Sequence, residues 1–152
     1  MIIFKKEDLT KAPRGIIAHG VNCQGAMGSG VAKAIRERWP AVYDAYKCIT
    51  PKPIEALGNV QMVNVSETAS LFVANCFTQF NYGRDGKKYA NADAIKEALN
   101  RVYSWADEFR LDVHIPKIGC GLGGLSWEDD VYPIIEELDN KYSHVDTYVY
   151  EI

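Results

Sequence analysis

The chain has 152 residues, of which 47% are hydrophobic and 24% are charged, and its formal net charge is −3. These values are ordinary for one globular domain, and they exclude a disordered, collagen-like or disulfide-framework protein. The acidic balance also disfavours a protein that holds nucleic acid mainly by neutralising phosphates.

Neither a membrane span nor a metal site is indicated by the sequence. No apolar run approaches the ~20 residues that a span needs, and the N-terminal residues lack the apolar segment of a secretory signal. The four cysteines, Cys23, Cys48, Cys76 and Cys120, form no C-x-x-C pair and have no histidine at zinc-finger spacing. We therefore expect a cytoplasmic protein with reduced thiols, no membrane partner, no metal and no cofactor.

Short apolar runs alternate with longer helical patterns along the whole chain. The runs cover residues 2–4, 15–19, 60–65, 71–77, 113–115 and 145–150, and several are continuous, which is typical of strands covered on both faces. Three segments carry apolar side chains at helical spacing. Their stripes are Val31, Ile35, Trp39, Val42 and Tyr46; Ile95, Leu99, Val102, Trp105 and Phe109; and Val131, Ile134, Ile135 and Leu138.

This ββαββαβαβ order predicts a mixed, mostly parallel sheet with helices on both faces, a three-layer α/β/α sandwich. Residues 50–58 and 80–92 are short enough to be loops, so residues 1–152 form a single domain. Ser126 and Asp129 resemble a capping box for the last helix. In such sheets ligands bind beyond the carboxyl ends of the strands.

Two glycine-rich loops follow strands at these ends. The first, residues 19–31, leads into the first helix, and glycine lets a backbone approach an anion at a helix N-terminus. The second contains Gly119, Gly121 and Gly124 in a G-x-G-x-x-G pattern. Only 28 residues follow Gly124, too few to complete a dinucleotide-binding domain, and no Walker pattern is present. Two facing anion loops would instead form a cleft for a diphosphate, beside which Asp8 could accept from an adenine amino group or a ribose hydroxyl.

In combination, these segments resemble the macrodomain family, which binds ADP-ribose. The similar motifs are residues 7–10, 22–32, 75–79 and 116–127, and the last, P-K-I-G-C-G-L-G-G-L-x-W, is the most specific. The resemblance covers essentially the whole chain. Within the family the chain is similar to the branch of ADP-ribose 1''-phosphate phosphatases, the terminal ADP-ribose protein glycohydrolase and antitoxins that remove ADP-ribose from DNA.

The resemblance implies a role for each matching position. Asp8 would hold the adenine amino group, with Leu9 beside it. The distal ribose and part of the diphosphate would lie against Asn22, Gln24, Gly25, Met27, Gly28, Ser29, Gly30 and Val31. Backbone N–H groups of Gly119, Cys120, Gly121, Leu122 and Gly123 would bind the diphosphate, and Thr78, Gln79 and Tyr82 would line the distal-ribose end.

Two positions depart from the glycohydrolase pattern. Where the glycohydrolases and antitoxins have a lysine shortly after the fourth strand, this chain has Gln79, which is no nucleophile. Where the glycohydrolase has an aspartate in the last glycine loop, this chain has Gly123. Lys87 and Lys88 lie in the following loop, where they are either solvated or folded back towards the site.

Acid–base chemistry near the distal ribose rests on few groups. We expect His19 and Arg84 to be catalytic, the first as a proton acceptor or donor and the second as a bidentate clamp on a phosphate. Either cysteine of the glycine loops, Cys23 or Cys120, is reactive if the helix N-terminus lowers its pKa; otherwise it is simply a small residue under the ligand.

We therefore expect a monomeric hydrolase that converts ADP-ribose 1''-phosphate to ADP-ribose and phosphate. One alternative is the hydrolysis of ADP-ribosyl or O-acetyl-ADP-ribose esters, which would make ADP-ribosylated macromolecules its partners. Another is an ADP-ribose-binding module without turnover. A nucleic-acid-binding role rests only on the basic residues between 84 and 88.

Overall fold

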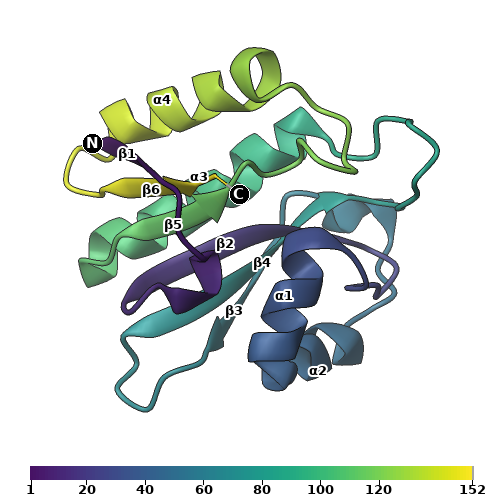
Figure 1. The fold of residues 1–152 in the computed structure, drawn as a ribbon, viewed down its shortest axis with the longest axis horizontal. Coiled ribbons are helices and arrows are strands. Elements are labelled where there is room, and N and C mark those ends of the chain that lie inside the picture. Colours follow the sequence, from purple (N-terminus) through teal and green to yellow (C-terminus); the bar gives the residue numbers. More distant parts are fainter. Residues whose placement is uncertain (152) are drawn as a thin grey trace.

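The computed structural model describes residues 1–151, which form a six-stranded sheet between two pairs of helices (Figure 1). The strands are β1 (Ile2–Lys5), β2 (Gly15–Asn22), β3 (Val60–Asn64), β4 (Leu71–Gln79), β5 (Val113–Pro116) and β6 (Thr147–Tyr150). The helices are α1 (Gly30–Arg38), α2 (Pro40–Cys48), α3 (Ala92–Phe109) and α4 (Tyr132–Lys141), with short turns at Leu9–Lys11, Ile54–Ala56 and Trp127–Val131.

The strands lie in the order β1-β6-β5-β2-β4-β3. Every neighbouring pair is parallel except β3 and β4, which are antiparallel. The predicted mixed, mostly parallel sheet is therefore confirmed. Because β2, β4, β5 and β6 run in the same direction, their carboxyl ends meet at one edge, and both glycine-rich loops leave from it.

Strand β2 shows why helices cover both faces of this sheet. Its side chains alternate, so Ile16 and Ala18 pack into the core beneath α3 and α4, whereas Ile17 and Val21 pack into the core beneath α1 and α2. All four side chains are buried. A strand apolar on both faces is stable only between two covering layers, which confirms the three-layer prediction.

The first helical stripe is divided between two helices, whereas the sequence pattern predicts one. Trp39 ends α1 with φ −132° and ψ 83°, and Pro40 begins α2. Proline has no N–H for a preceding helix and its ring clashes with the preceding turn, so the chain bends here. Ile35, Val42 and Tyr46 still reach the core, and Trp39 is 9% exposed.

The predicted apolar stripe of α3 includes two residues that the structure leaves at the surface. Ile95, Leu99 and Val102 are buried, but Trp105 is 37% exposed and Phe109 is 52% exposed. The buried face of α3 instead continues through Tyr103 and Ala106. Trp105 and Phe109 pack against each other at the helix surface, with ring centroids 4.9 Å apart and ring planes tilted by 42°.

The cap of the last helix uses a different carboxylate from the predicted one. Ser126 Oγ accepts from the N–H of Asp129 at 3.2 Å, but the Ser126 N–H donates to Asp130 Oδ2 at 2.8 Å. The first turn, Trp127–Val131, is a wide π turn. The extra residue in that turn places Asp130, rather than Asp129, next to the Ser126 N–H.

Among the residues that the structure describes, no helix combines the length and the apolar character needed to cross a membrane.

Candidate functional site

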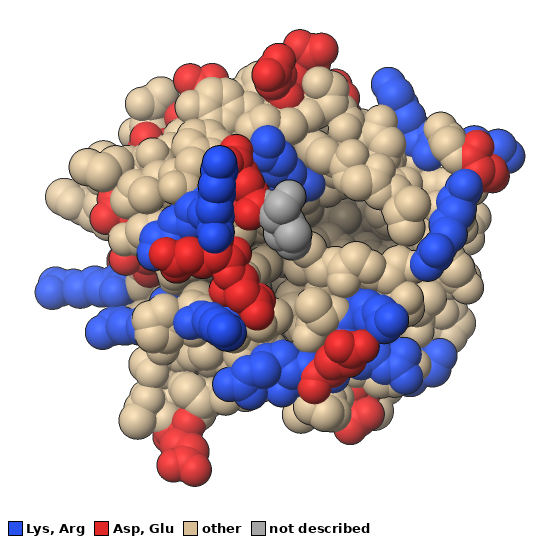
Figure 2. Space-filling model, in the orientation of Figure 1, with Lys and Arg blue, Asp and Glu red and all other residues tan. Residues whose placement is uncertain are grey.

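A groove runs along the carboxyl edge of the sheet, and Figure 2 shows the hollow with both basic and acidic side chains near its margin. It has three adjoining parts with volumes of about 820, 390 and 530 Å³. We name them the Asp8 end, the centre and the Arg84 end. Gly30, Val31 and Glu151 line both the Asp8 end and the centre. Gly20, Ser29, Ala32, Gln79 and Leu122 line both the centre and the Arg84 end.

A fixed carboxylate lies at the Asp8 end. Asp8 caps the turn Leu9–Lys11, and its Oδ1 accepts from the Thr10 N–H at 2.9 Å and from Thr10 Oγ1 at 2.7 Å. These hydrogen bonds lower the pKa of Asp8, so it is ionised at neutral pH. Its Oδ2 is left for a ligand, and Leu9 is buried beside it.

The start of α1 faces the centre of the groove. Ser29, Gly30, Val31 and Ala32 all line it, and no side chain caps the helix N-terminus. The first N–H groups of a helix have no partner within the helix and carry a partial positive charge. This part of the groove is therefore suited to an anion.

The second glycine-rich loop closes the other side of the centre, and its glycines serve two purposes. Gly119 has φ +76°, and a Cβ at Gly123 would lie 2.6 Å from the Gly119 carbonyl oxygen. The Gly123 carbonyl also accepts from the N–H groups of Tyr89 and Ala90. The backbone conformation therefore favours glycine at position 119, and packing requires it at position 123.

Two other glycines face open space. A Cβ at Gly28 or Gly121 would meet nothing within 4 Å, and neither residue has a positive φ. Gly28 lines the Arg84 end and Gly121 lines the centre. Since neither the backbone conformation nor packing needs glycine at these two positions, they leave the groove wide enough for a ligand to approach the backbone.

His19 lies in the floor of the groove at the end of a buried polar row. Its Nε2 is 2.6 Å from Asn75 Oδ1, Asn75 Nδ2 donates to Gln61 Oε1, and Gln61 Nε2 donates to the Ala45 carbonyl. Because Asn75 uses its amide to reach Gln61, its oxygen faces His19, and His19 Nε2 is the donor. His19 Nδ1 then has no partner among the described residues.

Burial determines the charge of this histidine. It is 1% exposed, and desolvation lowers its pKa to about 4 although the Asn75 hydrogen bond favours the charged form. His19 is therefore a neutral imidazole at neutral pH, with one nitrogen free to accept.

At the Arg84 end, a loop reaches across to the first glycine-rich loop. Arg84 Nη2 donates to Ser29 Oγ at 2.6 Å, and Tyr82 is 58% exposed beside it. Asn22 also lines this end, but its side chain is already engaged: Nδ2 donates to the Ala26 carbonyl, and Oδ1 accepts from the Gln24 N–H and the Tyr46 hydroxyl. Asn22 therefore holds the shape of the loop.

Most of the predicted ligand-binding residues lie in the groove, with Thr78, Gln79 and Leu122 in its centre. Four others do not line it. Met27 is 1% exposed in the core, the Gly25 N–H donates to the Tyr46 hydroxyl, Gln24 Nε2 donates to the Phe80 carbonyl, and Cys120 Sγ contacts the Ile118 carbonyl.

The structure disfavours reactive cysteines. Burial raises the pKa of the Cys23 thiol, and burial together with the Asp130 carboxylate raises that of Cys120. Neither is a thiolate at neutral pH. Residues 1–151 contain no group of three or more His, Cys, Asp or Glu side chains that could hold a metal ion.

The sequence reasoning missed the residues at the very ends of β5 and β6. Pro116, Lys117, Ile118, Tyr150 and Glu151 line the groove where these strands end. A signal was available, because the rule that ligands bind beyond the carboxyl ends of strands applies to every parallel strand.

The fold and the groove together define an α/β/α sandwich with paired glycine-rich loops at one sheet edge. The sequence model of the Macro domain family matches residues 18–133, so the chain belongs to this family.

Named relatives fall into two groups. The chain is 28% identical over 182 residues to an ADP-ribose 1''-phosphate phosphatase from Debaryomyces hansenii, covering 98% of this chain and 99% of that protein. It is 30% identical over 130 residues to a DNA ADP-ribosyl glycohydrolase from Mycobacterium tuberculosis, covering 85% of this chain. The match spans only 36% of that glycohydrolase.

Solved structures share the fold over the whole chain. A protein from Bacteroides thetaiotaomicron has a TM-score of 0.85 at 31% identity, and all of both chains is covered. The macrodomain of Mycobacterium tuberculosis DarG has a TM-score of 0.84 at 24% identity, covering 100% of this chain and 98% of that one.

Proposed function

We propose that the chain binds ADP-ribose in this groove and hydrolyses ADP-ribose 1''-phosphate to ADP-ribose and phosphate. The observation that carries the proposal is the order of groups along the groove. A carboxylate lies at one end, the uncapped N-terminus of α1 and the second glycine-rich loop lie in the centre, and an arginine lies at the other end.

Each part matches one part of the ligand. The free oxygen of Asp8 can accept from the amino group of adenine. The N–H groups of α1 and of the loop around Gly121 suit the diphosphate. Arg84 then faces the distal ribose and the phosphate on its 1'' oxygen, where a planar guanidinium can make two parallel hydrogen bonds.

Hydrolysis at this end needs a water molecule and a way to stabilise negative charge. Water attacks the phosphorus, the bond from phosphorus to the 1'' oxygen breaks, and that oxygen takes up a proton to become the hydroxyl of ADP-ribose. Arg84 neutralises the phosphoryl oxygens as this happens. His19 lines the centre of the groove rather than this end, and it is neutral with a buried Nδ1, so it does not donate the proton that the leaving oxygen takes up.

The geometry also supports a phosphatase over a lysine-assisted glycohydrolase. Gln79 carries an amide, which donates to the Asn81 carbonyl, and neither Lys87 nor Lys88 is among the residues that line the groove. At Gly123 any side chain would overlap the Gly119 carbonyl, which leaves no room for an aspartate.

A second candidate is the removal of ADP-ribose from an ester or from a macromolecule. It is favoured by the 30% identity to a DNA ADP-ribosyl glycohydrolase. The same groove would hold the ADP-ribose part. Water would then break the bond from C1'' to the macromolecule, or the acyl–oxygen bond of an ester, in place of the phosphorus–oxygen bond. A binding module without turnover is the third outcome to be distinguished.

A ³¹P NMR time course of ADP-ribose 1''-phosphate with the purified protein tests the proposal. We expect inorganic phosphate and ADP-ribose to accumulate together, and we expect Arg84→Ala to slow this while Lys88→Ala, on the same loop but outside the groove lining, does not. Shifts of the resonances without turnover would contradict the phosphatase and lead to ester-linked ADP-ribose as substrate. Absence of any shift would contradict ADP-ribose binding itself.

A further inference from the structure

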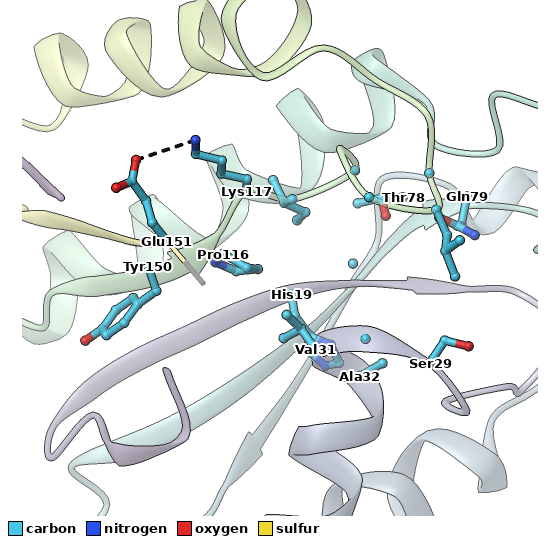
Figure 3. Close-up of a pocket in the computed structure, with 17 residues that line it drawn as sticks. His19, Ser29, Val31, Ala32, Thr78, Gln79, Pro116, Lys117, Tyr150 and Glu151 are labelled. Atoms are coloured by element: carbon cyan, nitrogen blue, oxygen red, sulfur yellow. Dashed lines mark ion pairs between the residues drawn. The ribbon is translucent and has the colours of Figure 1, made fainter. Parts of the chain in front are cut away.

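An ion pair stands at the junction between the Asp8 end and the centre. Lys117, just after β5, and Glu151, just after β6, lie with Nζ and Oε1 3.5 Å apart (Figure 3). Their side chains are 41% and 35% exposed. Figure 3 shows the pair at one end of the centre, well away from Ser29, Thr78 and Gln79.

The position of Glu151 along the groove determines what it can meet. The three residues shared by the Asp8 end and the centre are Gly30, Val31 and Glu151, and only Glu151 has a polar side chain. If adenine lies at Asp8 and the diphosphate lies in the centre, as proposed above, the sugar that joins them passes this junction. Among the three shared residues, only Glu151 can then form a hydrogen bond through its side chain with the hydroxyls of this sugar.

We propose that Glu151 recognises the free 2′-hydroxyl of the adenosine ribose and rejects a ligand that carries a phosphate there. The inference rests on the proposed ADP-ribose site and assigns its specificity. A carboxylate accepts hydrogen bonds from a sugar hydroxyl, which is how nucleotide sites select a free ribose over a phosphorylated one.

The charges at the Asp8 end also disfavour a ligand with a 2′-phosphate. Its lining contains three carboxylates, Glu7, Asp8 and Glu151, and one ammonium group, Lys6. A phosphate monoester carries a charge of about −1.5 to −2 at pH 7. Placing it beside a partly buried carboxylate is unfavourable, since like charges at short range repel and are only partly screened.

Lys117 has the opposite effect on a 2′-phosphate, because its charge is positive. It holds Glu151 through the ion pair and also brings a positive charge to the junction. Its removal would leave the carboxylate unbalanced and increase the repulsion of a 2′-phosphate. The two partners of one ion pair should therefore change ligand preference in opposite directions.

Calorimetric titration of the full chain with two ligands tests this inference. One is ADP-ribose and the other is ADP-ribose with a phosphate on the adenosine 2′ oxygen. We expect the unmodified protein to bind ADP-ribose at least about tenfold more tightly. Glu151→Gln should lower that ratio several-fold, Lys117→Gln should raise it, and Glu128→Gln, an exposed carboxylate outside the groove lining, should leave it unchanged.

The outcomes separate this inference from the proposed function. If neither ligand binds, the ADP-ribose site is wrong and the inference falls with it. If the unmodified protein binds both ligands equally, ADP-ribose binding stands and Glu151 has no such role. If Glu151→Gln and Lys117→Gln weaken both ligands by the same factor, the pair only fixes the ends of two strands, and the inference is overturned.

Discussion

The floor and the rim of the groove meet within the second glycine-rich loop, where Gly123 belongs to the floor and Gly121 to the rim, yet their surroundings differ. The floor contains His19, Thr78 and Gly123, all buried and in contact with neighbouring elements. The rim contains Gly121 and Asp8, which are exposed. Changes in the floor should therefore alter mainly the stability of the fold, whereas changes in the rim should alter mainly ligand binding. Four predictions test this difference, from the largest expected effect to the smallest.

Gly121→Glu places bulk and negative charge on the rim, where the diphosphate is expected. Because a side chain at this position meets nothing within 4 Å, the fold should tolerate it. We expect ADP-ribose affinity to fall at least about 100-fold through like-charge repulsion and blocking, with an unchanged melting temperature. Undiminished binding in calorimetry would place the ligand elsewhere.

The charge state of His19 in the floor should appear as a pH dependence of stability. Its pKa is lowered from 6.5 to about 4 in the folded chain, so the unfolded chain takes up the proton first as the pH falls. The stability is therefore fully present above about pH 6.5 and is lost progressively down to about pH 4. The size is about 3 kcal/mol, since one pKa unit corresponds to about 1.4 kcal/mol.

Urea unfolding of the unmodified chain and of His19→Gln at pH 7.5 and pH 4.5 measures this effect. His114 is also buried with a lowered pKa, but it is present in both proteins and its contribution cancels in the difference. An identical loss of stability in the two proteins would show that His19 is not held neutral by burial.

Asp8→Ala removes a carboxylate from the rim. We expect ADP-ribose binding to weaken by about 1.5–3 kcal/mol, the usual effect of losing a hydrogen bond to a charged group. Alanine also removes the cap of the turn Leu9–Lys11, so Asp8→Ser is the matched variant, because serine keeps the cap without the carboxylate. Wild-type affinity in Asp8→Ser would mean that the cap, and not the charge, is needed.

Gly123→Ala tests the floor of the second glycine-rich loop. The added methyl group would overlap the Gly119 carbonyl and approach the Ala90 side chain, so we expect the free energy of unfolding to fall by about 1–3 kcal/mol. Gly121→Ala, in open space on the same loop, should change it by less than about 0.5 kcal/mol. Equal melting temperatures for the two variants would remove the distinction between floor and rim.

Sequence reasoning named most residues that line the groove but not the contacts that hold them in place. Asn22 lines the Arg84 end, and its side chain also makes hydrogen bonds within the first glycine-rich loop and to Tyr46, which residue spacing does not predict. His19 was expected near the chemistry, and its neutral state depends on Asn75, which is 56 positions away along the chain. The bend at Pro40 was visible in the sequence, because proline inside a helical pattern ends or kinks the helix, and it was overlooked.

The sequence by itself determined the family and the alternation of strands and helices, apart from the division between α1 and α2, and it indicated the sheet edge that carries the groove. Apolar periodicity and glycine spacing are local properties of the chain. Only the tertiary structure decided which glycines are needed for packing and which leave room for a ligand, since Gly121 and Gly123 are indistinguishable by spacing. The tertiary structure also determines the strand order β1-β6-β5-β2-β4-β3 and the ion pair between Lys117 and Glu151. These depend on contacts between distant segments, which no local pattern contains.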